Sequence, residues 1–206
     1  AKIAGTGMDA LAALGIVLPI TLIIQAFANL VGLGGAPRAG IKLGEGNSDE
    51  ADRIFNTSFV LLSVIGIVIG AGTFLFAKPI IVLFGCPPSA VEFAVSYLRI
   101  YSCGTLFVML AQGLNPFILT QGYSFIAMSS VLIGAVINIV LDPIFIFTFG
   151  MGVSGSSLAT VISQFCSCIC IIGFFCTRKS LFRFHIKNMR ISYKRVMNIV
   201  SLGFTP

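Results

Sequence analysis

The sequence predicts an all-α protein, a polytopic bundle of transmembrane helices. Of its 206 residues, 57% are hydrophobic and 10% are charged, whereas a soluble domain carries about 25% charged residues. Five apolar runs are each at least as long as the ~20 residues that a membrane-spanning helix needs. No alternation with the period of two that strands require persists along the chain. This composition requires lipid as the solvent around most of the surface.

The five spans follow one another with short polar links. In this prediction residues 38–53 form a polar loop, in which Asn47, with Glu50 three residues later, fits a helix N-cap. Ser89, directly after two prolines, is the expected cap of the third span. We expect full spans over residues 9–34, 56–77, 91–119, 127–147 and 154–175, with a sixth beginning near Val196.

The distribution of basic residues predicts the orientation of the bundle. Loop 38–53 holds three Lys or Arg and loop 178–195 holds seven, against three in the rest of the chain. Positively charged loops stay in the cytoplasm. Four spans separate the two loops, so we expect both to be cytoplasmic, in the plasma membrane (the inner membrane) of a bacterium. Five spans then place Ala1 outside, and we expect one further span before it.

Asp142 is the carboxylate that lies deep in an apolar run. Ionisable groups at such depth are costly and are usually functional. Pro143 frees one backbone carbonyl of the helix, and Asn138 lies one turn earlier on the same face. This face therefore offers a carboxylate, an amide and a carbonyl to a proton or a cation. The alternative is a structural carboxylate that caps a neighbouring helix or pairs with Arg99.

Further polar side chains recur at helical spacing in the first and fifth spans. Ser156, Thr160 and Gln164 lie on one side of the fifth span, where Thr160 offers an oxygen ligand. The alternative there is a packing face of small residues. Gln25 and Asn29 share a face of the first span. They either line a polar cavity or form hydrogen bonds across helices.

Other classes of function lack the residues that they need. The sequence offers no Ser-His or Cys-His catalytic set, so we do not expect an enzyme. The glycines of residues 32–35 follow no strand and precede no phosphate-binding Lys, so they are not a nucleotide loop. The net charge of +6 comes from basic residues placed between apolar runs. Membrane topology explains these residues, and no nucleic-acid partner is expected.

Several segments resemble the multidrug and toxic compound extrusion (MATE) family. Residues 9–16 (Asp-Ala-Leu-Ala-Ala-Leu-Gly-Ile) resemble the link between its first two helices, and residues 40–53 resemble its first cytoplasmic loop. Residues 138–147 (Asn-Ile-Val-Leu-Asp-Pro-Ile-Phe-Ile-Phe) resemble the fifth helix. Residues 150–164 (Gly-Met-Gly-Val-Ser-Gly-Ser-Ser-Leu-Ala-Thr-Val-Ile-Ser-Gln) resemble the sixth and are the most specific feature. Residues 201–206 resemble the start of the seventh.

The resemblance implies the domain organisation. The family has twelve helices in two six-helix lobes, and this chain matches helices two to six. Residues 1–177 then form the N-lobe bundle without its first helix. Residues 178–195 form the basic cytoplasmic loop between the lobes, and residues 196–206 begin the seventh helix. The bilayer, the first helix and the C-lobe of the same protein are the expected partners.

The resemblance also implies the function. The family exports small organic, often cationic compounds against a proton or sodium gradient, so we expect a multidrug antiporter with no cofactor beyond the coupling ion. The family's N-lobe cation site matches Asp142, Asn138 and Thr160, which implies that these residues hold H⁺ or Na⁺. The first-helix Asp of that site is expected before Ala1.

Four more residues are candidates for the substrate cavity: Gln25, Asn29, Gln164 and Ser156. Two alternative functions stay open at this point. One is a lipid-linked saccharide flippase of the same superfamily, which tends to have a more cationic cavity. The other is a membrane subunit that transports nothing.

Overall fold

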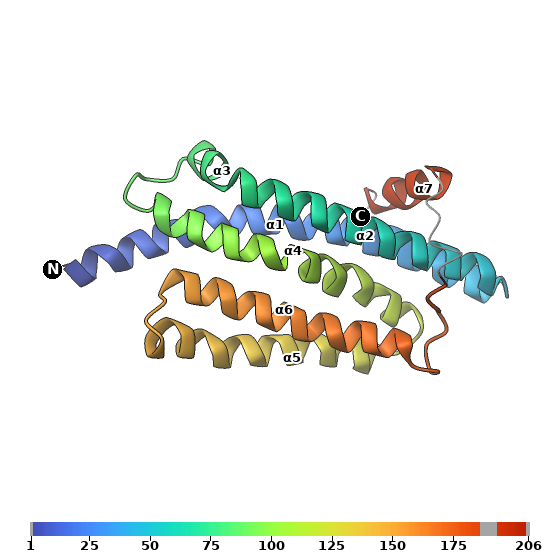
Figure 1. Ribbon diagram of the computed structural model, residues 1–206. Helices are drawn as coiled ribbons and strands as arrows, with labels where there is room; N and C mark the ends of the chain where they lie inside the picture. Colours follow the sequence, from blue (N-terminus) through green and yellow to red (C-terminus); the bar gives the residue numbers. More distant parts are fainter. Residues whose placement is uncertain (1, 186–192, 205–206) are drawn as a thin grey trace.

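The computed structural model describes residues 2–185 and 193–204, and every regular element in these ranges is helical (Figure 1). Five of the helices are long and apolar enough to cross a membrane. The predicted fold class, an all-α bundle with five spans, is therefore confirmed, and the chain is a multi-pass membrane protein. The ends of the helices differ from the prediction at several places, each for an identifiable reason.

Helix α1 (Lys2–Gly44) is continuous over 43 residues. At ~1.5 Å per residue it is about 65 Å long, roughly twice the ~30 Å hydrocarbon core of a bilayer. Its last turns, which carry Arg38 and Lys42, therefore extend past the apolar core. The predicted loop over residues 38–53 is wrong in extent, because hydropathy marks where a helix leaves the lipid and not where the helix ends.

Helix α2 (Ser48–Leu75) begins after a turn of only a few residues, 45–47. The Glu50 backbone N–H donates to Asn47 Oδ1 at 3.1 Å, which confirms Asn47 as the N-cap. After α2 comes a short helix, α3 (Ala77–Leu83), that was not predicted. Ser89 does not cap the next helix, contrary to the prediction. Its hydroxyl donates to Asp9 Oδ1 at 2.7 Å and so ties this link to α1.

Helix α4 (Val91–Thr120) runs through the middle of the bundle, with α1 and α2 on one side and α6 on the other (Figure 1). Two of its glycines allow the close approach. A Cβ at Gly104 would meet the Val161 side chain of α6, and a Cβ at Gly113 would meet the Leu62 side chain of α2. Small residues at such contacts let membrane helices pack backbone to backbone.

Helix α5 (Ser124–Pro143) packs chiefly against α6 (Val153–Cys176) and turns most of its apolar side chains outward. It continues into a short π-helical segment, η1 (Ile144–Thr148). Pro143 has no N–H to give to the preceding turn, and an irregular turn follows it. Gly150 and Gly152, at φ 65° and 56°, then reverse the chain into α6.

Residues 180–185, here called the strap, lie across the end of the bundle and are not a solvated loop. Phe182 is fully buried, with its ring centroid 5.5 Å from that of Phe55. The strap backbone pairs with two side chains of α2. Arg183 N donates to Asp52 Oδ1 at 2.9 Å, and His185 N donates to Asn56 Oδ1 at 3.2 Å.

Helix α7 (Tyr193–Gly203) packs on α1 and α2 at the same end of the bundle (Figure 1). It begins at Tyr193, slightly before the predicted position. Two glycines bring the backbones together: a Cβ at Gly34 would meet the Ile199 carbonyl, and a Cβ at Gly203 would meet the Leu30 carbonyl. Since Ile199 faces Gly34 and Gly203 faces Leu30, α7 runs antiparallel to α1, back into the apolar part of the bundle.

Candidate functional site

Asp142 lies in the last turn of α5, directly before the π-helical segment. Its side chain is half-buried, and the Ser156 hydroxyl of α6 lies beside its carboxylate. The Oδ1 atom is buried and has no hydrogen-bond partner within the described chain. Buried polar atoms are nearly always paired. An unpaired carboxylate oxygen therefore indicates a place for a proton, a cation or a water molecule.

Asn138 and Thr160 lie next to each other, one turn deeper than Asp142. Asn138 Nδ2 is 3.4 Å from Thr160 Oγ1, a long hydrogen bond, and the Thr160 hydroxyl donates to the Ser156 carbonyl at 3.0 Å. The structure thus brings together four of the predicted residues, from two neighbouring helices. The predicted alternative of an Asp142–Arg99 ion pair is absent from residues 2–185 and 193–204. The Arg99 guanidinium instead lies 6.0 Å from the centroid of the Phe74 ring.

Two tyrosines of α4 extend this cluster and were missed in the sequence. The Tyr97 hydroxyl lies near Thr160, and the Tyr101 hydroxyl lies near Gln25 on α1. The two rings stack with their centroids 6.3 Å apart, and the Ser157 hydroxyl fixes the α4 backbone by donating to the Tyr97 carbonyl at 2.8 Å. A pair of tyrosines one helical turn apart in an apolar run was the available signal.

The described part of the chain offers oxygen ligands for one small monovalent ion and little else. It holds no group of three or more His, Cys, Asp or Glu side chains that could bind a metal ion. The cluster combines one carboxylate with hydroxyl groups and an amide, named above. Hard cations prefer oxygen ligands of this kind, and a single carboxylate balances a single charge. The donor set therefore fits a proton or one Na⁺.

A polar cavity of about 270 Å³ adjoins this cluster between α4, α5 and α6. Asn138 and Thr160 belong both to the cluster and to the cavity wall, and Gln164 lines the cavity one turn beyond Thr160. The other polar residues of the wall are neutral amides and hydroxyls: Gln112, Asn115, Ser130, Ser163 and Ser167. The cavity therefore has polar groups in its wall but no charged side chain.

The remaining predicted cavity residues divide into two groups. Gln25 reaches the cluster through Tyr101, as described, and Ser156 lies beside Asp142. Asn29 is exposed on the surface of α1 and does not line the polar cavity. Helical spacing placed Gln25 and Asn29 on one face of α1. In the structure only Gln25 is covered by α4, where it lies beside Tyr101.

Five helices of spanning length around an internal cluster of polar side chains define a multi-pass membrane protein. Comparison with known proteins gives the family. The model of the family described as MatE matches residues 2–144, and the chain belongs to this family.

Similar proteins agree with this assignment. The multidrug export protein MepA of Staphylococcus haemolyticus (strain JCSC1435) is 28% identical over 193 residues, which are 94% of this chain and 43% of that protein. A solved inward-facing multidrug resistance MATE family transporter of the MOP superfamily matches with a TM-score of 0.90 at 26% identity, over 95% of this chain and 45% of its own.

A crystal structure of MATE in the bent conformation also matches with a TM-score of 0.90, at 27% identity, over 98% of this chain and 45% of its own. The chain thus spans less than half the length of these similar proteins.

Proposed function

We propose that this chain forms one lobe of a cation-coupled antiporter that exports small organic compounds across the plasma membrane of a bacterium. The observation that carries the proposal is the buried Asp142 oxygen without a partner, set among oxygen donors at the end of a polar cavity. The name of the similar staphylococcal protein, a multidrug exporter, supports the direction of transport.

The coupling follows from residues that the ion and the solute share. Asn138 and Thr160 contact each other beside the Asp142 cluster and also line the cavity. A proton or Na⁺ on Asp142 draws these donors toward the carboxylate, whereas a solute in the cavity draws them away from it. The two ligands therefore compete, and each shifts the lobe only by its differential affinity for the two conformations. Competition of this kind is what exchange of an ion for a solute requires.

The uncharged cavity favours an organic solute over a lipid-linked saccharide. A phosphate-bearing substrate requires basic side chains, because strong recognition of phosphate depends on charge-assisted hydrogen bonds from Arg or Lys. No Lys, Arg or His is among the residues that line this cavity. Amides and hydroxyls can hydrogen-bond many neutral or cationic compounds, and apolar residues such as Val131 and Ile171 complete the wall. This is the composition expected of a cavity with broad specificity.

The orientation proposed for the bundle keeps the turn at residues 45–47 and the strap in the cytoplasm. Both lie at the same end of the bundle as the link between α4 and α5 (Figure 1). The described basic residues of these two segments lie at this end, which supports a cytoplasmic placement for it.

The test is transport by the full-length protein in lipid vesicles. A fluorescent organic cation is enclosed, and a proton gradient or a sodium gradient is imposed separately. We expect one of the two gradients to drive movement of the dye. When that gradient is dissipated, the rate should fall to the rate in vesicles without the protein. Equal movement with and without both gradients would contradict coupled antiport. No movement under any condition would favour a membrane subunit that transports nothing.

A further inference from the structure

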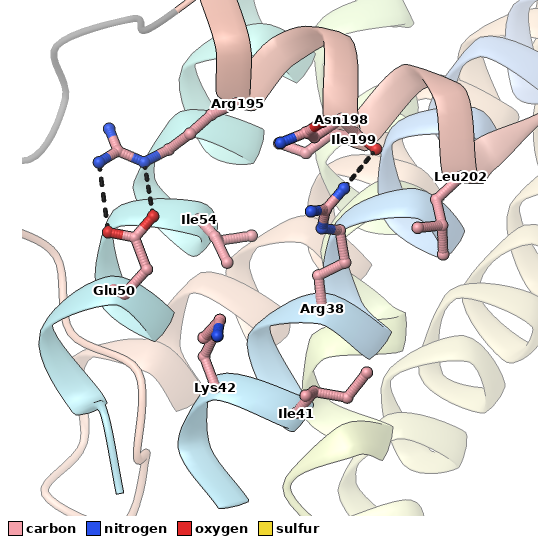
Figure 2. Close-up of a pocket in the computed structure, with 9 residues that line it drawn as sticks. All are labelled: Arg38, Ile41, Lys42, Glu50, Ile54, Arg195, Asn198, Ile199 and Leu202. Atoms are coloured by element: carbon pink, nitrogen blue, oxygen red, sulfur yellow. Dashed lines mark hydrogen bonds and ion pairs between the residues drawn. The ribbon is translucent and has the colours of Figure 1, made fainter. Parts of the chain in front are cut away.

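A second pocket lies at the cytoplasmic end of the bundle, apart from the Asp142 cluster. It has a volume of about 280 Å³ and forms where the end of α1, the start of α2 and helix α7 meet (Figure 2). None of its residues belongs to the cavity between α4, α5 and α6. Its lining combines charged and aliphatic side chains, and none of them takes part in the proposed transport site.

The charged part of the lining is mostly basic. Of the described residues around the pocket, Arg38, Lys42 and Arg195 are cations and Glu50 is the one carboxylate. Glu50 is already engaged, because Arg195 Nε and Nη2 donate to its two oxygens at 2.8 and 3.2 Å (Figure 2). The pocket therefore has two further cations, Arg38 and Lys42, one helical turn apart on α1, and neither forms an ion pair with Glu50 in the described chain.

Arg38 is the cation with the weakest compensation. Its Nη1 donates to the Asn198 carbonyl at 2.9 Å, a bond that crosses from α1 to α7 (Figure 2). The ion pairs of the described chain do not include Arg38. Lys42 pairs with Glu45, which lies outside the pocket and is exposed, at 2.6 Å. Exposed pairs of this kind contribute little and exchange easily, so Lys42 is available to another anion.

The aliphatic part of the lining opens toward the outside of the bundle. Ile41 on α1 is 61% exposed, and Leu202 on α7 is 41% exposed. Ile54 and Ile199 form the buried back of the pocket. The pocket thus pairs cations with exposed aliphatic groups at the depth where the long helices leave the apolar core. A phospholipid has the same two parts, a charged headgroup and acyl chains.

We infer that this pocket binds the headgroup phosphate of an anionic phospholipid of the cytoplasmic leaflet. The phosphate lies between Arg38 and Lys42, and an acyl chain runs along Ile41 and Leu202. Basic pockets between transmembrane helices on the cytoplasmic side bind such headgroups, and Arg in particular matches phosphate geometry. The inference rests on the proposed orientation of the bundle. A bound lipid joins α1 to α7 and so stabilises the contact between them.

The test measures lipid binding rather than transport, so it can fail independently of the proposed function. The full-length protein in neutral detergent is titrated with phosphatidylglycerol or phosphatidylcholine, and bound lipid is counted by native mass spectrometry. We expect tighter binding of phosphatidylglycerol, and a loss of roughly thirtyfold in its affinity for the double variant Arg38→Gln/Lys42→Gln, from about fivefold for each basic residue removed.

Two controls make the result specific. Lys78→Gln/Arg99→Gln removes the same charge from exposed positions away from the pocket and should leave the affinity unchanged. Arg38→Lys/Lys42→Arg keeps the charge and should retain binding, which separates loss of the site from loss of the fold. Equal affinity for both lipids, or an equal loss in both neutralised variants, would overturn the inference. If inorganic phosphate protected the protein against thermal unfolding as well as phosphatidylglycerol does, the pocket would bind free phosphate and the lipid assignment would be wrong.

Discussion

Replacement of Asp142 by Asn in the full-length protein should reduce gradient-driven export to the rate measured in vesicles without the protein. The amide has nearly the shape of the carboxylate but cannot take up and release a proton, and it carries no charge to balance Na⁺. Because Oδ1 is already buried without a partner, the substitution removes no hydrogen bond to that atom. We therefore expect the melting temperature to change little while coupled export is lost.

The matched control for Asp142→Asn is Glu92→Gln. Glu92 is an exposed carboxylate in the first turn of α4, outside the cluster. Its conversion to the amide should leave export unchanged. Cells that express the Asp142→Asn protein should be as drug-sensitive as cells without the transporter. Undiminished resistance in those cells, at equal amounts of protein in the membrane, would contradict the role given to Asp142.

Replacement of Asn56 by Leu should detach the strap from the bundle. Asn56 is fully buried, and its amide donates to the Arg183 carbonyl at 2.8 Å and accepts from His185 N at 3.2 Å. Leucine leaves both backbone groups without these partners, at a cost of ~1–3 kcal/mol for each buried polar group. We expect the free energy of unfolding to fall by about 2–4 kcal/mol.

Limited digestion with trypsin gives a local readout of the same change. The strap and the residues before it contain cleavage sites at Arg178, Lys179 and Arg183, and their cleavage should be faster in the Asn56→Leu protein. Thr57→Val is the control, since Thr57 is equally buried but its hydroxyl donates within its own helix, to the Arg53 carbonyl at 2.7 Å. Equal cleavage rates in the two variants would show that Asn56 does not hold the strap.

The strap also illustrates what the sequence could not predict. Asn56 stood at the start of an apolar run and Arg183 in a basic segment, and the two are far apart in the chain. A hydrogen bond between a side chain and a distant backbone group leaves no periodic signal in either segment. Composition therefore indicated only a basic cytoplasmic loop, and it gave no sign that residues 180–185 dock on the bundle.

Local signals were more reliable. The length of the apolar runs predicted the five spans, because a bilayer imposes a minimum length on each helix. Asn47 was found from its spacing to Glu50, and this cap depends on four consecutive residues. Helical spacing was enough to place Asp142 and Asn138 one turn apart, because both lie on α5. Tyr97 and Tyr101 were missed because their part in the cluster depends on how α4 packs against α6 and α1.

Binding of the coupling ion to the purified full-length protein tests the central claim most directly. Uptake of protons after a shift in pH, and uptake of radioactive Na⁺ at fixed pH, are measured for the unchanged protein, Asp142→Asn and Glu92→Gln. We predict that Asp142→Asn binds one coupling ion fewer than the other two. Equal binding by all three proteins would contradict the assignment of Asp142 as the residue that holds the ion.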